Sequence, residues 1–296
     1  MKQFKITAAL LLCTLNIYAA DSSTTGYLDW VEMDIKANVR LSLAGLGLAM
    51  PTGRKIAEER LYSAYYASIP PFIYSIPVDS SSVLGDFVER GELAPETVDK
   101  LTFDAKIVPP FISPDIQEIS ASYQINLSEV SSALIKHKNG ADFPYIVNPK
   151  PAAVWTGIVI IAIEPLPVHG RKNSALLSPC LFPKIWDTEM RLVFDKKHTD
   201  PSIFLNSTMV NYMGSEHIFQ RNASGLSSDI QKIVGNKPLR IIARGVFGIN
   251  PTDPVIDAED AREILATEAN RRLLREGRVV IITQEAVLKT ELRSSH

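Results

Sequence analysis

Two segments of the chain alternate strictly between apolar and polar side chains. The longer segment runs from Val31 to Leu43, and the shorter one runs from Ile119 to Leu127. A period of two is the repeat of an extended strand, whose successive side chains point to opposite faces of a sheet. Both segments are therefore predicted to be strands with one face in the core and the other face in water.

Helical signals and prolines divide the rest of the first half. A helix is predicted from Arg54 to Ile69, where small and apolar residues recur along one side. Prolines punctuate the chain between Pro70 and Pro114, leaving a strand-like piece at Phe72–Ile76 and short helices at Ser82–Glu89 and Pro95–Ala105. The first half is thus a mixture of helices and strands.

The second half begins with its own core strand. Val154 to Ile163 is a continuous apolar run, which is typical of a central strand buried on both faces. Ile185–Trp186 and Arg191–Phe194 are predicted to be two strands joined by a tight turn. A closing strand-helix-strand unit is predicted at Leu239–Val246, Asp257–Arg275 and Arg278–Ile282.

These elements predict an α+β protein with two sheet-containing domains and helices packed on one face of each sheet. The proline-rich stretch Asn148-Pro149-Lys150-Pro151 is the best candidate for a joint, because proline stops both helix and ladder and stiffens the chain. The expected division is therefore an N-terminal domain at 21–147, a linker at 148–151 and a C-terminal domain at 152–296.

The first 20 residues have the features of a secretory signal peptide. A short cationic start at Met1–Lys5 precedes the apolar run Ile6–Leu15, and Ala19-Ala20 precede Asp21. The run is too short to span a bilayer, and no later apolar run reaches that length. We therefore expect cleavage near Ala20, a periplasmic location and no transmembrane span in the mature chain.

The charge composition excludes some classes of partner, and the cysteine content limits the disulfides that can form. The chain is 46% hydrophobic and 22% charged with a formal net charge of −2. This balance, without a basic run, argues against nucleic acid or an anionic membrane as the main partner. Cleavage removes Cys13, and because Leu12 precedes it a lipoprotein anchor is not expected. Cys180 then remains as a buried small hydrophobe or as a thiol for intermolecular pairing in an oligomer.

Candidate metal chemistry is sparse. No two histidines have the spacing of a helical metal pair; they are His137, His169, His198, His217 and His296. The densest acidic group is Asp253, Asp257, Glu259 and Asp260, which lacks the ligand pattern of a calcium loop. Carboxylates are common in a first helical turn, so Asp257 is expected to cap the helix that follows it.

Candidate catalytic and cofactor motifs are equally weak. Ser215 lies in Gly214-Ser215-Glu216-His217, but the full Gly-x-Ser-x-Gly elbow is absent. Gly45-Leu46-Gly47 follows a predicted strand without the third glycine of a dinucleotide site. The sequence therefore predicts no catalytic residue, no cofactor-binding residue, no cofactor and no metal ligand.

Short motifs in both halves carry a family resemblance. The C-terminal ones are Trp155-Thr156-Gly157-Ile158-Val159-Ile160, Pro179–Asp187 and Glu276–Ile281, and Arg54-Lys55-Ile56-Ala57-Glu58 is the N-terminal one. This pattern resembles exported bacterial proteins related to flagellar assembly protein T and LPP-type lipoproteins. Two positions depart from it. Ile161–Glu164 replaces an Asp-Ala-Arg-Gly stretch, and Met190 replaces a turn glycine, so a different turn geometry is expected there.

The resemblance implies a non-enzymatic assembly or scaffold protein with envelope or flagellar-motor partners. Two other classes stay open from the residues alone. One is a periplasmic hydrolase whose catalytic residues are distant in sequence. The other is a carrier of a small apolar ligand, held in a cleft between the halves.

The export signal gives the first testable prediction. Amino-terminal sequencing of the native protein should find a mature chain that begins within a few residues of Asp21, because the small residues at Ala19 and Ala20 form the cleavage site. Native protein that still carries Met1 would contradict a cleaved leader.

Overall fold

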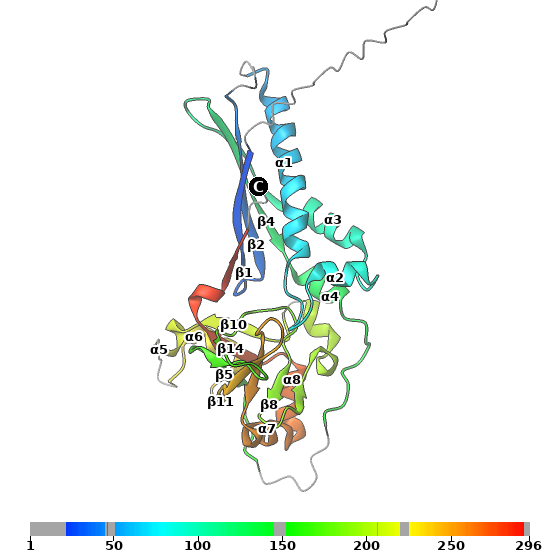
Figure 1. The fold of residues 1–296 in the computed structure, drawn as a ribbon, viewed down its shortest axis with the longest axis vertical. Helices are drawn as coiled ribbons and strands as arrows, with labels where there is room; N and C mark the ends of the chain where they lie inside the picture. The colour runs from blue at the N-terminus through cyan, green and yellow to red at the C-terminus, as the bar shows by residue number, and fades with distance from the viewer. Residues whose placement is uncertain are drawn as a thin grey trace, which may run out of the picture.

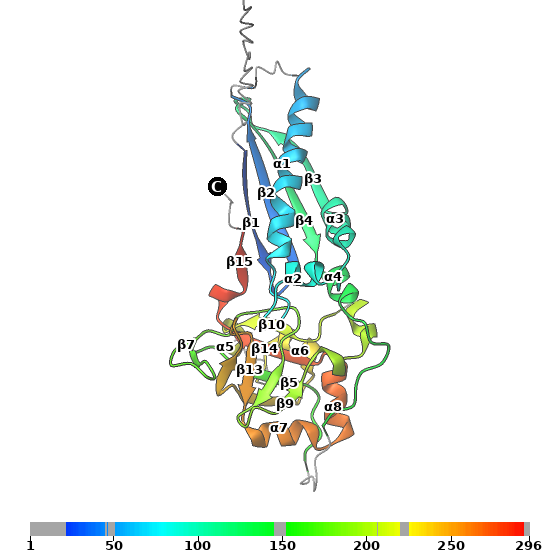
Figure 2. The same cartoon turned by 45° about the vertical axis from the view of Figure 1, so that its right-hand side comes forward.

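The computed structural model describes residues 22–44, 46, 51–144, 152–205, 207–219 and 225–292. The expected signal peptide at 1–20, the linker at 148–151, both glycines of Gly45-Leu46-Gly47, and His296 lie outside the described residues. The α+β class is confirmed, with sheets in both halves of the chain. A long N-terminal sheet stands on a broader C-terminal domain (Figures 1 and 2).

The N-terminal sheet is antiparallel, with strand order β15-β1-β2-β4-β3. Its strands are β1 (Ser22–Asp29), β2 (Asp34–Ser42), β3 (Lys106–Ile112), β4 (Glu118–Asn126) and β15 (Lys289–Glu291). The two alternating segments form the central pair β2 and β4, as predicted. The first one starts later than expected, because Val31 and Met33 lie in the β1–β2 turn, where Met33 has a φ of 55°. The Asp29 carboxylate accepts the N–H of Val31 at 3.1 Å, which fixes this turn.

Four helices lie on the buried side of this sheet. The longest, α1, packs along the strands (Figures 1 and 2). They are α1 (Arg54–Tyr74), α2 (Leu84–Glu89), α3 (Pro95–Phe103) and α4 (Ser128–Ala133). The prediction of a strand at Phe72–Ile76 is wrong, because α1 continues through Pro70 and Pro71. Ile73 is fully buried in the core. Its burial offsets the helical hydrogen bonds that the two prolines remove.

A second pair of prolines lies inside a strand. Pro109 and Pro110 belong to β3, whose pairing with β4 shifts between Val108 and Phe111. A proline is tolerated at a sheet edge or a bulge because the ladder does not need its missing N–H there. Pro109 and Pro110, which predicted an interruption of regular structure, therefore lie in the edge strand of the sheet. There they hinder pairing with a further strand.

The C-terminal domain contains a parallel sheet with strand order β10-β14-β5-β11. Its strands are β5 (Ile158–Ile161), β10 (Asn211–Gly214), β11 (Leu239–Ile242) and β14 (Val279–Thr283). The predicted central strand is confirmed in β5. Ile158 and Ile160 face the main core, whereas Val159 packs with α6 (Ser228–Val234) on the opposite face.

A mixed sheet with order β12-β13-β8-β9 completes this domain. Its strands are β8 (Ile185–Asp187), β9 (Leu192–Phe194), β12 (Gly245–Phe247) and β13 (Asp253–Ile256). The remaining elements are β6 (Leu166–Pro167), β7 (Ser174–Ala175), α5 (Glu216–Phe219), α7 (Ala258–Leu265), α8 (Glu268–Arg275) and the 3-10 turns Lys196–His198, Pro201–Leu205 and Glu285–Val287. Among the described residues, no helix is both long enough and apolar enough to cross a bilayer.

Two predicted elements of this domain are each divided in two. The expected strand Leu239–Val246 becomes β11 and β12, which belong to different sheets. The expected helix Asp257–Arg275 becomes α7 and α8. The Thr267 hydroxyl accepts the N–H of Asn270 at 3.2 Å and starts the second helix as its N-cap.

The two domains share one hydrophobic core and one sheet. Trp30, at the end of β1, is 1% exposed and donates its indole N–H to the Thr290 hydroxyl at 2.9 Å. Its ring meets the edge of Tyr212 of the C-terminal domain at 6.2 Å. Strand β15 then leaves the C-terminal domain and pairs with β1 (Figure 1). The last strand of the expected domain 152–296 therefore belongs to the N-terminal sheet. There it covers part of the β1 edge, whose backbone groups would otherwise be unpaired.

The turn between β8 and β9 differs from expectation. Met190 has a φ of 58°, so this methionine adopts the left-handed conformation that glycine favours. The Asp187 carboxylate accepts the N–H groups of Glu189 and Arg191, both at 2.9 Å, and also binds the Arg191 guanidinium at 2.7 Å. These bonds hold the turn against the strain at Met190.

The burial pattern of β2 predicts a clear asymmetry between its faces. Val39→Asp should lower the free energy of unfolding by about 4 kcal/mol, because it places a charge in the core. Lys36→Ser, on the open face, should change that free energy by about 0.5 kcal/mol or less. Urea unfolding with matched m-values checks both variants, and similar midpoints would contradict the register of β2.

Strain at the β8–β9 turn predicts a stabilising substitution. Met190→Gly should raise the free energy of unfolding by about 0.5–1 kcal/mol, since glycine adopts a positive φ without a Cβ clash. Met190→Ala is the matched control, because it keeps the Cβ atom. Thermal unfolding that gives both variants the same stability would show that the turn is not strained.

Candidate functional site

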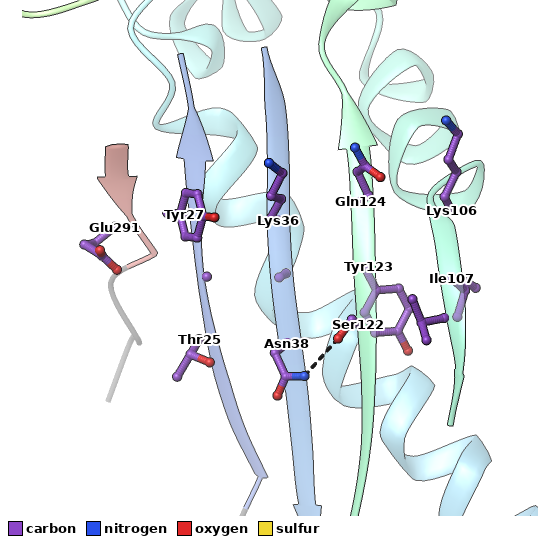
Figure 3. A pocket seen from close by; sticks show the side chains of 13 residues that line it. Thr25, Tyr27, Lys36, Asn38, Lys106, Ile107, Ser122, Tyr123, Gln124 and Glu291 are labelled. Carbon is purple, nitrogen blue, oxygen red and sulfur yellow. Dashed lines mark hydrogen bonds between the residues drawn. The ribbon is translucent and has the colours of Figure 1, made fainter. Parts of the chain in front are cut away.

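The face of the N-terminal sheet that points away from α1 is open and hollowed. A groove of about 590 Å³ crosses its five strands (Figure 3). We call it the sheet groove. Its outward-facing side chains are Thr25 and Tyr27 of β1, Lys36 and Asn38 of β2, Lys106 and Val108 of β3, Ser122 and Gln124 of β4, and Glu291 of β15.

Strand register places these side chains in rows that run across the sheet. The first row is Glu291, Tyr27, Lys36, Gln124 and Lys106, with one residue from each strand. The second row is Thr25, Asn38, Ser122 and Val108. The first row carries long side chains. In the second row, the side chains of Thr25, Asn38 and Ser122 are short. The polar positions that alternate along β2 and β4 therefore line this face. We call the short polar side chains of Thr25, Asn38 and Ser122 the floor of the groove, and the longer side chains of the first row stand beside them.

Hydrogen bonds hold the floor in place. The Asn38 amide donates to the Ser122 hydroxyl at 3.1 Å, which is the dashed line in Figure 3. Arg40 Nε donates to Asn38 Oδ1 at 3.0 Å from the neighbouring row. At the start of β2, the buried Asp34 carboxylate accepts hydrogen bonds from Gln124 and from Asn126. These side chains are therefore oriented before any ligand arrives.

The charges around the groove are unevenly paired. Lys36 Nζ lies 3.7 Å from the Asp29 carboxylate, and Lys289 Nζ lies 4.9 Å from the centre of the Tyr27 ring. Lys106 has no ion-pair partner in the part of the chain that the structure describes. The β3 end of the groove thus presents an available cation.

Exposed apolar side chains gather along β3, beside the groove. Ile107, Val108 and Phe111 are 42%, 61% and 62% exposed, and Phe103 and Ile116 flank the strand at 72% and 51%. Val108 also belongs to the second row of the groove. Exposed apolar side chains that cluster on one edge are typical of an interaction surface.

A stack of tyrosines supports the groove from the buried side. The Tyr123 ring of β4 lies flat on the Tyr65 ring of α1, with 3.7 Å between ring centres. The Tyr65 hydroxyl donates to the carbonyl of Thr102 at 2.9 Å, tying α1 to α3. Burial raises the pKa of both phenols. The stack fixes β4 on α1.

The candidate serine and histidine do not meet each other. Ser215 Oγ donates to the Glu285 carboxylate at 2.9 Å, whereas His217 Nδ1 lies 3.2 Å from the hydroxyl of Ser227. Glu216 shares a hydrogen bond with Glu285, which raises the pKa of Glu216 and lowers the pKa of Glu285 to about 2. Ser215 and Glu285 lie at the carboxyl ends of β10 and β14, and Ser215 and His217 do not form a dyad.

The acidic residues singled out from the sequence, Asp253 and Asp257 among them, make separate structural contacts and do not form one site. Asp257 occupies the N-cap position of α7, but its carboxylate binds Arg244 at 2.7 Å and makes no capping bond. Asp253 is buried, which raises its pKa, and it accepts the N–H of Lys184 at 3.0 Å. Within the described ranges, no group of three histidine, cysteine or acidic residues is arranged to hold a metal ion.

Cys180 and three of the histidines have packing or hydrogen-bonding roles in the structure. Cys180 is 1% exposed, and burial raises the pKa of its thiol, so it is the expected buried hydrophobe. The buried His198 lies 2.9 Å from the Asp195 carboxylate. His137 lies 2.9 Å from the carbonyl of Thr199, and the ring of His169 meets Phe247.

None of the groove residues was singled out from the sequence. The alternation of β2 and β4 predicted a wet face, but it did not predict what else would join that face. β1 is rich in serine and threonine, β3 contains two prolines, and β15 lies at the far end of the chain. The only available signal was the polar positions of the two central strands.

Two family models match the chain, one in each domain. Residues 21–133 match the N-terminal domain of Treponema pallidum Tp0624, and residues 157–285 match its second domain. No curated protein matches the chain. Neither model names flagellar assembly protein T or LPP-type lipoproteins, so that relationship stays a prediction. The two domains of this chain are therefore similar, in the same order, to two domains of one bacterial protein, Tp0624.

Proposed function

We propose that this protein is a non-enzymatic assembly or scaffold component of the bacterial periplasm. In this proposal it binds partner proteins through the sheet groove and the β3 edge. The observation that carries the proposal is that the exposed apolar side chains of Val108 and Phe111 lie on the open face of the sheet, at its β3 edge. Apolar surface of this kind is stabilised when a partner removes it from water.

The shared core supports the scaffold role. Because Trp30 and β15 join the two domains into one packed unit, the groove is held on a rigid base. A scaffold needs a surface that keeps its shape before binding, since ordering a surface on binding costs free energy.

Export and an envelope location belong to the same proposal. Strand β1 begins at Ser22, and the match to the N-terminal domain model begins at residue 21. Both positions directly follow the expected cleavage near Ala20. The resemblance to flagellar assembly protein T supports a motor-associated ring or another envelope complex as the place of assembly.

The proposal predicts that the β3 edge is needed in the cell. A strain that lacks the gene should lose a density layer of the envelope or motor in electron cryotomography. The native gene and the control Ile249→Glu should restore that layer, because Ile249 is 68% exposed in the C-terminal domain, away from β3. Val108→Glu with Phe111→Glu should not restore it, since two charges would be desolvated at the contact.

Two results would contradict the proposed function. One is normal envelope and motor architecture in the deletion strain. The other is purified protein that turns over ester, peptide or glycan substrates. Thermal unfolding of the β3 variant must match the native protein, so that its failure reports a lost contact and not a lost fold.

A further inference from the structure

We infer that Asp253 is a proton-sensitive latch between the two domains. In this inference, mild acid tightens the contact between the C-terminal domain and the loop 77–82, which lies between α1 and α2. The inference goes beyond the proposed function, because it concerns how the C-terminal domain holds the sheet and not what the sheet binds.

The loop 77–82 belongs to the N-terminal domain, but backbone groups of the C-terminal domain hold it. The N–H groups of Leu181 and Phe182 donate to two of its carbonyl groups, at 3.1 and 2.8 Å. The N–H of Asn250 donates to the carbonyl of Ser80 at 3.0 Å, and Ser80 is buried. These three amides therefore report directly on the contact between the loop and the C-terminal domain.

The Asp253 carboxylate lies beside this contact and is 0% exposed. It accepts hydrogen bonds from the N–H of Lys184 at 3.0 Å, the indole of Trp186 at 3.2 Å and the hydroxyl of Thr252 at 3.2 Å. The hydroxyl of Ser80 in the loop also bonds to it. All four donors are neutral, and Asp253 forms no ion pair among the described residues. An ionised Asp253 is therefore a buried charge without a counter-ion there, which costs free energy.

This burial couples the loop contact to a proton. Burial raises the pKa of Asp253, and this effect exceeds the opposing effect of the hydrogen bonds and of the Lys184 charge. When the loop leaves, water reaches the carboxylate and its pKa returns toward the ordinary value of an aspartate. The closed contact thus binds the proton more tightly than the open one, so the proton favours closure. This stabilisation is fully present below the ordinary pKa and is lost as the pH rises through the raised pKa.

Other titratable groups face the same junction. They are Cys180, Lys184 and Tyr212 of the C-terminal domain, Lys196 in the turn after β9, and Asp79 of the loop. Burial raises the pKa of the Cys180 thiol and of the Tyr212 phenol, so both stay neutral in mild acid. Lys196 Nζ lies over two aromatic rings at 5.1 and 5.2 Å. The Asp79 carboxylate is bound by two N–H groups of its own loop, both at 2.9 Å. Asp253 is therefore the carboxyl group whose proton is coupled to the loop contact.

Amide hydrogen exchange of the mature full-length protein tests the inference, with the amides of Leu181, Phe182 and Asn250 as reporters. Their protection factors, corrected for the intrinsic exchange rate at each pH, should be larger by about threefold or more at about pH 5 than at about pH 7.5. The amides of β2 are the internal reference, because β2 lies in the middle of the N-terminal sheet. Unchanged protection of the three reporters, or a change that β2 shares equally, would overturn the inference.

A charge-removing variant assigns the effect to one carboxyl group. Asp253→Asn should abolish the pH dependence of the reporters, since an amide does not titrate in this range. Asp257→Asn is the matched control, because it removes the same charge from a partly exposed carboxylate that binds Arg244. The control should keep the pH dependence of the native protein. Equal loss of that dependence in both variants would overturn the inference.

A loop variant keeps the test decisive if Asp253→Asn does not fold. Ser80→Ala removes a hydroxyl that favours the charged carboxylate. The closed contact should then depend more strongly on the proton, and the ratio of the protection factors at the two pH values should rise. A ratio that falls or stays the same would overturn the inference. Circular dichroism and thermal midpoints verify that the variants fold.

Discussion

The register of β2 between β1 and β4 is the constraint on which the rest of the structure depends. In this register Val39 and Ile35 point at α1, whereas Lys36 and Asn38 point at the open face. A slip of one residue exchanges the two sets, because successive side chains alternate between faces. The cost of burying Lys36 therefore fixes the core and the rows of the sheet groove at the same time.

The groove is a product of both domains. Four of its strands come from the N-terminal half, and β15 arrives from the end of the chain. Trp30 and Thr290 hold that strand at the junction, beside Tyr212 of the C-terminal domain. The C-terminal domain thus supplies a base for the sheet and one border of its open face. The packed junction holds this surface while Cys180, the cysteine among the described residues, is a buried free thiol.

Periodicity was informative where burial differed between the two faces of an element, and much less so elsewhere. It identified β2, β4 and β5 because hydrophobic burial imposes a period or a continuous apolar run. It missed β1 and β3, whose edge positions tolerate serine, threonine and proline. Met190 shows a second limit, since the Asp187 carboxylate holds a turn conformation that the residue alone disfavours. The site could not be found from sequence, because Glu291 and Lys106 enter one row only through strand pairing.

The central claim is that the open face of the N-terminal sheet is where partners bind. Site-specific photocrosslinking in living cells tests it most directly, with the reactive group placed at Ser122 on the groove floor. The control position is Ser228, which is exposed at the start of α6 on the C-terminal domain. The account predicts a discrete crosslinked adduct with an envelope protein from position 122 and none from position 228. An adduct from position 228 alone, or none from either position, would contradict it.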